Sequence, residues 1–324
     1  MSNIDLHLFI YFACFLLLWV GSGLVVSSVI KLARSWRLSA FTLSFFLLGI
    51  ITSLPEMSIG AAAVIHGDPE IFAGNILGGV MVLMLGVIPL LGLAGGGVTI
   101  PKQLDKRQLM LTMAVIAAPA LITADQQLNP LKGAILLFLY GLLFFSTSFK
   151  QSLLEKVASS IKKNQRKKIG WLLTKILLGM IILVLASNQI VDSTLYFAKV
   201  MDISPFFLSL IVISIGTNIP ELSIVFRSIF QKRKEVALAD YLGSASANTL
   251  LFGLFSIIYG KTIFLPNHFW QRFAFLASGL ILFFMFARSK RRLSRKESAF
   301  LLLIYVVFVI FELMILPDMR ITMD

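Results

Sequence analysis

Apolar stretches long enough to cross a bilayer, about twenty residues each, recur along this 324-residue chain and constrain its fold more than any other feature. The chain is 58% hydrophobic and 14% charged, whereas soluble domains carry about 25% charged residues. We therefore predict an all-α integral membrane protein. Its ten expected spans lie near residues 9–30, 40–65, 71–94, 108–124, 131–148, 170–190, 204–228, 236–259, 271–288 and 299–316.

The charge distribution predicts how these spans are oriented. With the N-terminus placed outside, most of the 29 Lys and Arg residues fall in the connections on the inner side, including the run "KKNQRKK" in the middle connection. The positive-inside rule makes that side cytoplasmic and puts both termini outside. We expect a bacterial inner (plasma) membrane protein. Its net charge of +13 then reflects topology or contact with anionic lipid, and no nucleic-acid partner is expected.

The spans contain a sequence repeat. "IITSLPEMSI" (50–59) aligns with "IGTNIPELSI" (215–224), and the same shift of 165 residues pairs "GNILGG" (74–79) with "ADYLGS" (239–244). Because five spans, an odd number, precede the second half, the two halves must have opposite orientations, as in the inverted repeats of secondary transporters. We predict a first five-helix repeat over 1–148, a basic cytoplasmic loop over 149–169 and a second repeat over 170–324.

Each copy of the first motif gathers oxygen atoms around a proline. Thr52 and Ser53 precede Glu56 by four and three residues, so the three side chains share a helical face. A proline inside a helix disrupts the bond to the carbonyl four residues earlier, so we expect free carbonyls at Ile51 and Gly216. Such hard oxygen ligands suit Ca²⁺ or Na⁺. The alternative is a proline kink beside a stray, protonated glutamate.

The second motif is less symmetric between the two copies. In the second half it places oxygen-bearing side chains at i, i+4 and i+8 on one helical face, namely Asp240, Ser244 and Asn248. Their counterparts in the first half are Asn75, Gly79 and Leu83. Asp240 has a second interpretation as a solvated helix start. The glycines of this motif suit close helix packing, and Asp125 and Glu312 are expected at the outer rim.

These motifs resemble those of the cation/Ca²⁺ exchanger superfamily, in particular the sodium/calcium exchanger family, whose repeats carry G-T-S-L-P-E followed by G-N-x-x-G-S-x-x-x-N/D. The resemblance implies a ten-helix inverted repeat in which the glutamate of each repeat is a central cation ligand. By position, it assigns the cation ligands Thr52, Ser53, Glu56, Thr217, Asn218, Glu221, Ser244 and Asn248. We add Asp240, one turn before Ser244, to the predicted site as an additional charge.

The sequence also departs from that family pattern. Ile51 replaces a motif glycine, Asn218 a serine and Asp240 an asparagine. The departures that most affect the expected site are Gly79 and Leu83, which replace a ligating serine and asparagine. These departures leave the fold assignment intact but leave the ion stoichiometry open.

We therefore predict a membrane cation antiporter that exchanges Ca²⁺ against Na⁺ or H⁺ by alternating access at a midplane site, with Glu56 and Glu221 facing each other. A proton-coupled or monovalent exchanger is the alternative within transport, and a non-transporting cation sensor is the alternative from another class. The expected partners are the transported cations and the lipid bilayer. The oligomeric state is open, and a monomer is the simplest interpretation.

No enzyme activity or cofactor is expected. The sequence contains no recognisable nucleophile–base pair, and its three histidines, His7, His66 and His268, are scattered at positions expected to lie in loops or near the termini. A histidine-based metal or haem site is therefore not predicted. Cys14 is the single cysteine, so the chain cannot form an internal disulfide.

Overall fold

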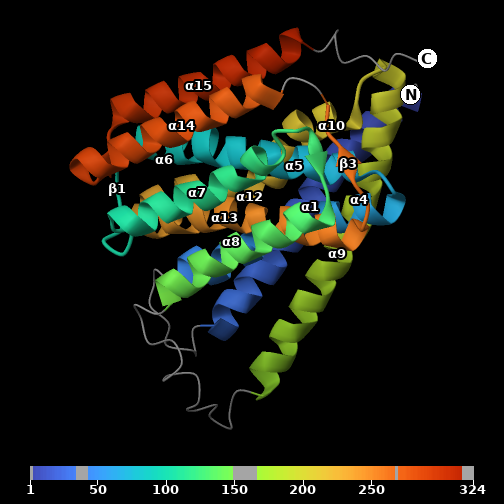
Figure 1. The fold of residues 1–324 in the computed structure, drawn as a ribbon. Coiled ribbons are helices and arrows are strands. Elements are labelled where there is room, and N and C mark those ends of the chain that lie inside the picture. The colour runs from blue at the N-terminus through green and yellow to red at the C-terminus, as the bar shows by residue number, and fades with distance from the viewer. Residues whose placement is uncertain (1–2, 34–42, 149–165, 267–268, 316–324) are drawn as a thin grey trace.

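The apolar stretches fold as helices in a computed structural model that describes residues 3–33, 43–148, 166–266 and 269–315 (Figure 1). Most of the expected 149–169 loop lies outside the described residues, and α9 already begins at Arg166. With η marking π-helical turns, the elements are α1 Asn3–Ala33, η2 Leu43–Leu48, α3 Gly49–Thr52, α4 Leu54–His66, α5 Pro69–Met81, η3 Val82–Val87, α6 Ile88–Ala94, β1 Val98–Thr99, α7 Lys106–Ile122, β2 Gln127–Leu128, α8 Pro130–Ser148, α9 Arg166–Met201, α10 Pro205–Leu208, η5 Ser209–Ile213, α11 Ser214–Thr217, α12 Ile219–Phe230, α13 Lys234–Tyr259, β3 Ile263–Phe264, α14 Phe269–Lys290, β4 Arg292–Leu293 and α15 Arg295–Met314.

Each of the ten predicted spans falls on one of these helices or on a chain of consecutive ones. Among the described residues, seven helices are long and apolar enough to cross a membrane, and an eighth span results if the bent pair Phe45–Thr52 and Leu54–His66 is counted as one. The 17-residue α7 and the apolar part of α8, Pro130–Ser146, are shorter. The chain is therefore an all-helical membrane protein by this measure, and the count of ten spans stays a prediction.

The two Pro-Glu motifs interrupt their helices in the same way. The chain bends by 47° between α3 and α4, and Pro55 lies in the first turn of α4, where its missing N–H costs little. The expectation of free carbonyls was wrong, because the tight turn lets the Ser53 N–H donate to the Ile51 carbonyl. Likewise the Asn218 N–H donates to the Gly216 carbonyl. Each carbonyl oxygen still keeps a second lone pair.

Glycines bring the interrupted helices into backbone contact with α5 and α13. A Cβ on Gly78 of α5 would overlap the Leu210 carbonyl oxygen of η5, and one on Gly243 of α13 would overlap the Phe45 carbonyl oxygen of η2. The 165-residue shift relates Gly78 to Gly243 and Phe45 to Leu210. Small residues at these positions let the helices approach closely, as in other membrane helix pairs.

Two short antiparallel ribbons are additions to the expected all-α fold. Strand β1 pairs with β4, with Val98 opposite Leu293, and β2 pairs with β3, with Leu128 opposite Ile263. The 165-residue shift turns each of these pairs into the other. In Figure 1, β1 and β3 lie at opposite ends of the bundle. Each strand has only two residues and lies in a connection between helices, so no period-2 pattern of strand length marks it in the sequence.

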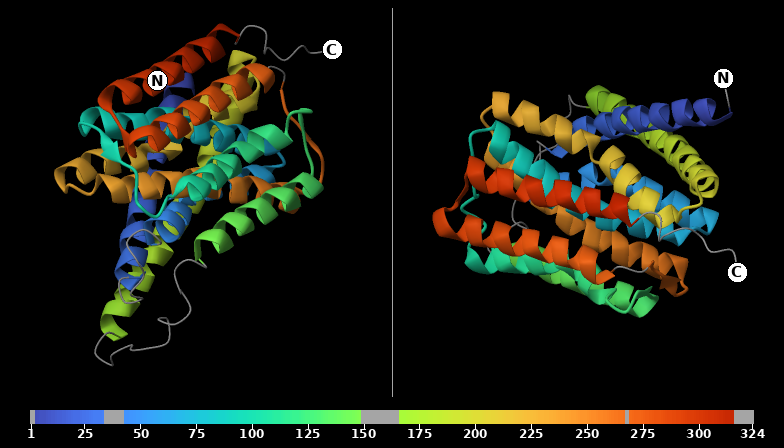
Figure 2. Two further views of the ribbon diagram at one scale, coloured as in Figure 1. Left: turned by 60° about the vertical axis from the view of Figure 1, so that its left-hand side comes forward. Right: turned by 90° about the horizontal axis from the view of Figure 1, so that it is seen from above.

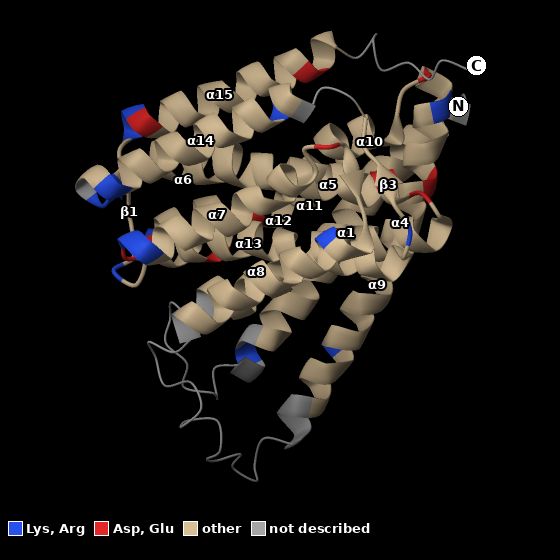
Figure 3. Cartoon of the chain, in the orientation of Figure 1, with Lys and Arg blue, Asp and Glu red and all other residues tan. Residues whose placement is uncertain are grey.

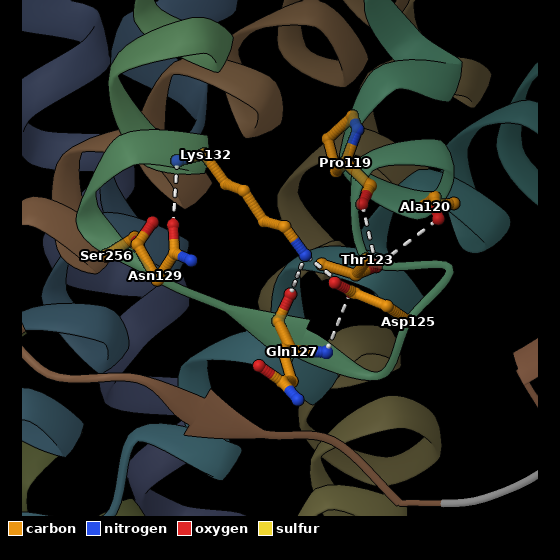
Figure 4. A network of polar contacts seen from close by, with 8 residues as sticks. All are labelled: Pro119, Ala120, Thr123, Asp125, Gln127, Asn129, Lys132 and Ser256. Atoms are coloured by element: carbon orange, nitrogen blue, oxygen red, sulfur yellow. Dashed lines mark hydrogen bonds and ion pairs between the residues drawn. The ribbon is translucent and has the colours of Figure 1, made fainter.

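Polar contacts fix the connection between α7 and α8 (Figure 4). Lys132 Nζ contacts the Asp125 carboxylate and donates to the Gln127 carbonyl oxygen at 2.7 Å. The Ser256 hydroxyl donates to the Asn129 carbonyl oxygen at 2.8 Å, which ties this connection to α13. Hydrogen bonding to Lys132 lowers the pKa of the exposed Asp125 carboxyl. Asp125 is therefore one of the polar residues that hold this connection.

Glu312, which was expected at the outer rim, forms a buried ion pair between α14 and α15. Its side chain is fully buried, and Arg272 donates to it through Nε at 2.8 Å and Nη2 at 3.1 Å. This bidentate contact compensates the carboxylate charge, as a buried charge requires.

The two ends of the bundle differ in their charged residues (Figure 3). The end that carries β1, β4 and the α12–α13 turn is called the basic end. The segments that meet there contain Lys102, Lys106, Arg107, Lys232, Arg233, Arg291, Arg292 and Arg295. The opposite end, with β2, β3 and the α4–α5 turn, is the His66 end. Helices α1 and α9 pack against each other along one flank of the molecule (Figure 2).

Candidate functional site

The two interrupted helices bring Glu56 and Glu221 into one buried region. Glu56 follows the break between α3 and α4 and is 1% exposed, and Glu221 follows the break between α11 and α12 and is fully buried. Asn218 Nδ2 donates to Glu56 Oε1 at 3.2 Å, which links the two motifs directly. Glu56 and Asp240 both lie close enough to Glu221 to repel its negative charge.

Two threonines also connect the two halves of the chain at the site. Thr217 of the second half lies beside the Glu56 carboxylate, and Thr52 of the first half lies beside the carboxylate of Glu221. The Thr217 hydroxyl donates to Asn75 Oδ1 at 3.2 Å. Each glutamate is therefore flanked by a hydroxyl group from the other motif. Asn75 was not among the predicted ligands, although the asparagine of the "GN" pair was a signal that could have found it.

Helix α13 adds Ser244 and Asp240 to the site. The Ser244 and Ser53 hydroxyls are hydrogen-bonded at 2.9 Å, and Ser53 also donates to the Gly49 carbonyl oxygen at 2.8 Å. Asp240 is 3% exposed and lies beside Thr52, more than one turn into α13. The interpretation of Asp240 as a solvated helix start was therefore wrong.

The residues that replace the family's ligands on the first half also lie at the site. A Cβ on Gly79 would be 3.1 Å from Asn248 Nδ2 and 3.4 Å from Asn218 Nδ2. Leu83 is fully buried one turn later, in η3. At positions 79 and 83, α5 and η3 thus present backbone and hydrocarbon, whereas the counterpart positions of α13 carry Ser244 and Asn248.

Many polar atoms of this region lack a hydrogen-bond partner among the described residues. These atoms are Glu56 Oε2, both Glu221 carboxylate oxygens, Asp240 Oδ1, Asn218 Oδ1, Asn75 Nδ2 and both Asn248 side-chain atoms. A buried polar group without a partner costs about 1–3 kcal/mol, and a buried charge costs more. None of the ion pairs in the described part of the chain involves these carboxylates. The site is therefore rich in acceptor oxygens and requires cations or protons.

The chemistry of these groups limits what they could hold. The described residues contain no set of three His, Cys, Asp or Glu side chains arranged to hold a metal ion. A cation here would therefore combine carboxylate oxygens with hydroxyl, amide, carbonyl or water oxygens. Such mixed oxygen ligands suit hard cations and are unsuited to soft metals.

A cavity of about 810 Å³ connects the site to the basic end. It lies between α1, α12 and α13, and Thr52, Pro220 and Asp240 line its part next to the site. Lys31, Arg227 and Arg233 line the cavity farther from the site. The carboxylate region is therefore approached from the basic end of the molecule.

Comparison with known proteins gives one consistent family. The family described as "Sodium/calcium exchanger protein" matches residues 6–149 and 171–314. The inner membrane protein YrbG of Escherichia coli is 26% identical over 75% of this chain and 79% of its own length. The sodium/calcium exchanger MaX1 of Methanosarcina acetivorans is 23% identical over 90% of this chain and 93% of its own.

A solved structure of the sodium-calcium exchanger NCX_Mj, soaked with Na⁺ and Sr²⁺, matches with a TM-score of 0.67. It is 20% identical in sequence, and the match covers 96% of this chain and 99% of that one, which shows a shared fold. Because the family match covers most of both halves of the chain, this protein is an integral membrane cation antiporter that belongs to the sodium/calcium exchanger family.

Proposed function

We propose that this antiporter exchanges Ca²⁺ against Na⁺ or H⁺ at the buried carboxylate site. The observation that carries the proposal is the pairing of Glu56 and Glu221, two buried carboxylates without a basic partner among the described residues. In the proposed site these carboxylates bind the cation together with Thr52, Ser53, Thr217, Asn218, Ser244, Asn248 and Asp240. The name of the relative MaX1 supports the choice of ions.

The charge of the site provides the coupling. Two carboxylates and one Ca²⁺ carry no net charge, so the loaded site can pass an apolar barrier. An unloaded site leaves two buried charges uncompensated, which is costly, so it must take up Na⁺ or protons before it moves. Because the competing ions use the same oxygens, release of one ion is tied to binding of the other.

We also propose that the two halves form an inverted repeat of five spans each, 1–148 and 170–324. The reciprocal ribbons support it, because the 165-residue shift exchanges the pair Val98 and Leu293 with the pair Ile263 and Leu128. The two glycine contacts are exchanged by the same shift. Such reciprocity is expected of two halves related by a twofold axis in the membrane plane, with the site at their interface.

The basic end is the cytoplasmic end in this proposal. The positive-inside rule places Lys- and Arg-rich connections in the cytoplasm, and Lys102, Lys232 and Arg291 belong to that end. Both chain termini and the His66 end then lie outside, in the inner membrane of a bacterium. The name of the Escherichia coli relative supports this location. The cavity next to Asp240 is then the cytoplasmic path to the site.

A second candidate function is proton-coupled or purely monovalent exchange. Gly79 and Leu83 favour it, because they remove two side-chain oxygens from the first half of the site. A hard cation with fewer ligands keeps more of its desolvation cost, so fewer ions are bound together. Protonation of the glutamates would then contribute more to coupling.

Uptake of radiolabelled Ca²⁺ into proteoliposomes distinguishes these functions. A Na⁺ gradient and a H⁺ gradient are imposed in turn, with protein-free liposomes as the control. Ca²⁺ uptake driven by either gradient supports the first proposal. Uptake of Na⁺ driven by a H⁺ gradient, without Ca²⁺ movement, supports the second, and no gradient-driven movement of any cation favours a non-transporting sensor.

A further inference from the structure

Helix α4 is attached to α9 at the His66 end by side-chain hydrogen bonds. The Ser58 hydroxyl donates to the Leu183 carbonyl oxygen at 3.0 Å and to the Ser187 hydroxyl at 2.8 Å. Two turns later, His66 Nε2 lies 3.2 Å from Asn188 Oδ1, and His66 Nδ1 lies 3.3 Å from Asp192 Oδ1. These contacts hold the two helices together on the side of the site opposite the cavity.

The equivalent residues at the basic end line the cavity and are not hydrogen-bonded to each other. The 165-residue shift relates Ser58 and His66 to Ser223 and Gln231 of α12. It relates the three α9 residues whose side chains make the contact, Ser187, Asn188 and Asp192, to Ser22, Gly23 and Ser27 of α1. All five of these counterparts line the cavity, and the Ser22 hydroxyl has no hydrogen-bond partner among the described residues. The hydrogen bonds that join α4 to α9 thus have no equivalent between α12 and α1 in the described part of the chain.

The two ends also differ in chemistry. His66 and Asp192 are ionisable, whereas their counterparts Gln231 and Ser27 are neutral. Asn188 Nδ2 donates to the Val184 carbonyl oxygen at 2.9 Å, which turns Oδ1 toward His66. Both imidazole nitrogens of His66 therefore face acceptor oxygens. A neutral imidazole has one N–H and satisfies one acceptor, while an imidazolium donates to both.

The charged groups around His66 are acidic. Asp192 reaches it from α9, and Asp68 lies beside it in the turn after α4. Partial burial raises the pKa of the Asp68 carboxyl, and His66 acts in the opposite direction. A protonated His66 would therefore lie beside two acidic side chains. Histidine is the side chain whose charge ordinarily changes between about pH 5 and 8.

We propose that His66, Asn188 and Asp192 form a latch that closes the His66 end of the transport path and that is strengthened when His66 is protonated. This inference rests on the proposed alternating access, for which one end must be closed while the other is open. Acidity at the His66 end then shifts the protein toward the state that is open only at the basic end. The basic end has no such control, because its counterpart residues do not titrate.

The test measures access to the His66 end directly, in the full-length protein in lipid nanodiscs. The reporter is Ala62→Cys in a Cys14→Ser background, because Ala62 is 3% exposed and its counterpart Arg227 lines the open cavity. A membrane-impermeant thiol reagent labels the reporter at about pH 8 and about pH 5.5, on either side of the usual histidine titration. The same reporter with His66→Gln corrects for the pH dependence of the thiol chemistry.

At the higher pH we expect equal labelling rates for the parent reporter and for the reporter that carries His66→Gln. At the lower pH the parent reporter should react more slowly than the reporter that carries His66→Gln. The expected difference is only about two- to fivefold, because a partly exposed ion pair is a weak interaction. Asp192→Asn should remove the difference as His66→Gln does. Identical ratios of parent to variant at both pH values would overturn the latch.

Two features of the design keep the outcome interpretable. If Ala62→Cys fails to fold, Ala63→Cys serves as the reporter, since its counterpart Ser228 also lines the cavity. Labelling requires no ion gradient, so it reports on the latch whether or not the protein moves Ca²⁺. Absence of Ca²⁺ exchange would contradict the proposed ions, whereas a pH-independent reporter ratio would contradict the latch alone.

Discussion

Glu221→Gln is expected to abolish Ca²⁺ exchange and leave the fold intact. Glu221 is fully buried, and glutamine has nearly the same shape, so the substitution removes the negative charge without leaving a cavity. Removing one partner of a buried charge interaction costs about 3–5 kcal/mol. At about 1.4 kcal/mol per tenfold, Ca²⁺ binding should weaken by a factor of about a hundred to several thousand.

Two assays measure this effect, and both use Glu235→Gln as the matched control because Glu235 is exposed in the first turn of α13. Uptake into proteoliposomes reports on exchange. The Ca²⁺-dependent rise in the unfolding midpoint reports on binding, since a ligand at about 100 times its Kd stabilises the parent by about 2.7 kcal/mol. Glu221→Gln should lose both signals and the control neither. Exchange by Glu221→Gln at the parent rate would refute the shared carboxylate site.

The remaining predictions concern the asymmetry, the packing and the topology. Gly79→Ser should raise the apparent Na⁺ affinity in uptake assays by about two- to tenfold, because one added polar contact is worth about 0.5–1.5 kcal/mol. An unchanged affinity would show that a side chain at this position does not reach the ion. Gly243→Ala should destabilise the protein by at least about 1–3 kcal/mol through overlap with a backbone carbonyl, whereas Gly141→Ala, with open space around it, should not, and thermal unfolding in detergent compares them. Cysteines placed in 162–168 should react with impermeant reagents only from the cytoplasmic side, and labelling from outside would contradict the proposed orientation.

Much of the site could be predicted because its residues stand out against an apolar background. Glu56 and Glu221 interrupt membrane-spanning stretches, and a buried carboxylate there needs a function. The repeat spacing then pointed to Ser244 and Asn248 on one face of α13, where the structure also has them. For these residues, the helical period and the cost of burying charge were enough to predict that they lie near one another.

Other features depended on contacts between distant segments, which spacing does not encode. Asn75 appeared only as a counterpart of Asp240, yet it accepts a hydrogen bond from Thr217 of the other half. Glu312 looked like a rim residue because its partner Arg272 lies forty positions away. The contact of His66 with α9 was equally invisible, since no local pattern relates it to Asp192.

The backbone details were missed for a different reason. The two-residue ribbons β1 to β4 are too short to produce an alternating pattern. The Ile51 carbonyl was expected to be free because the proline rule describes an unbroken helix. The chain instead ends α3 at Thr52 and turns, which supplies a new donor at Ser53. Propensity rules describe regular elements and say little about the breaks that build this site.

Equilibrium binding of radiolabelled Ca²⁺ to the purified protein tests most directly whether the two halves share one cation site. The binding is measured while Na⁺ or H⁺ is raised, in the parent and in Glu56→Gln and Glu221→Gln. The shared site predicts one Ca²⁺ per chain, competitive displacement by at least one of the two coupling ions, and loss of binding in each variant. Ca²⁺ binding that persists in either variant, or that neither Na⁺ nor H⁺ displaces, would contradict the account.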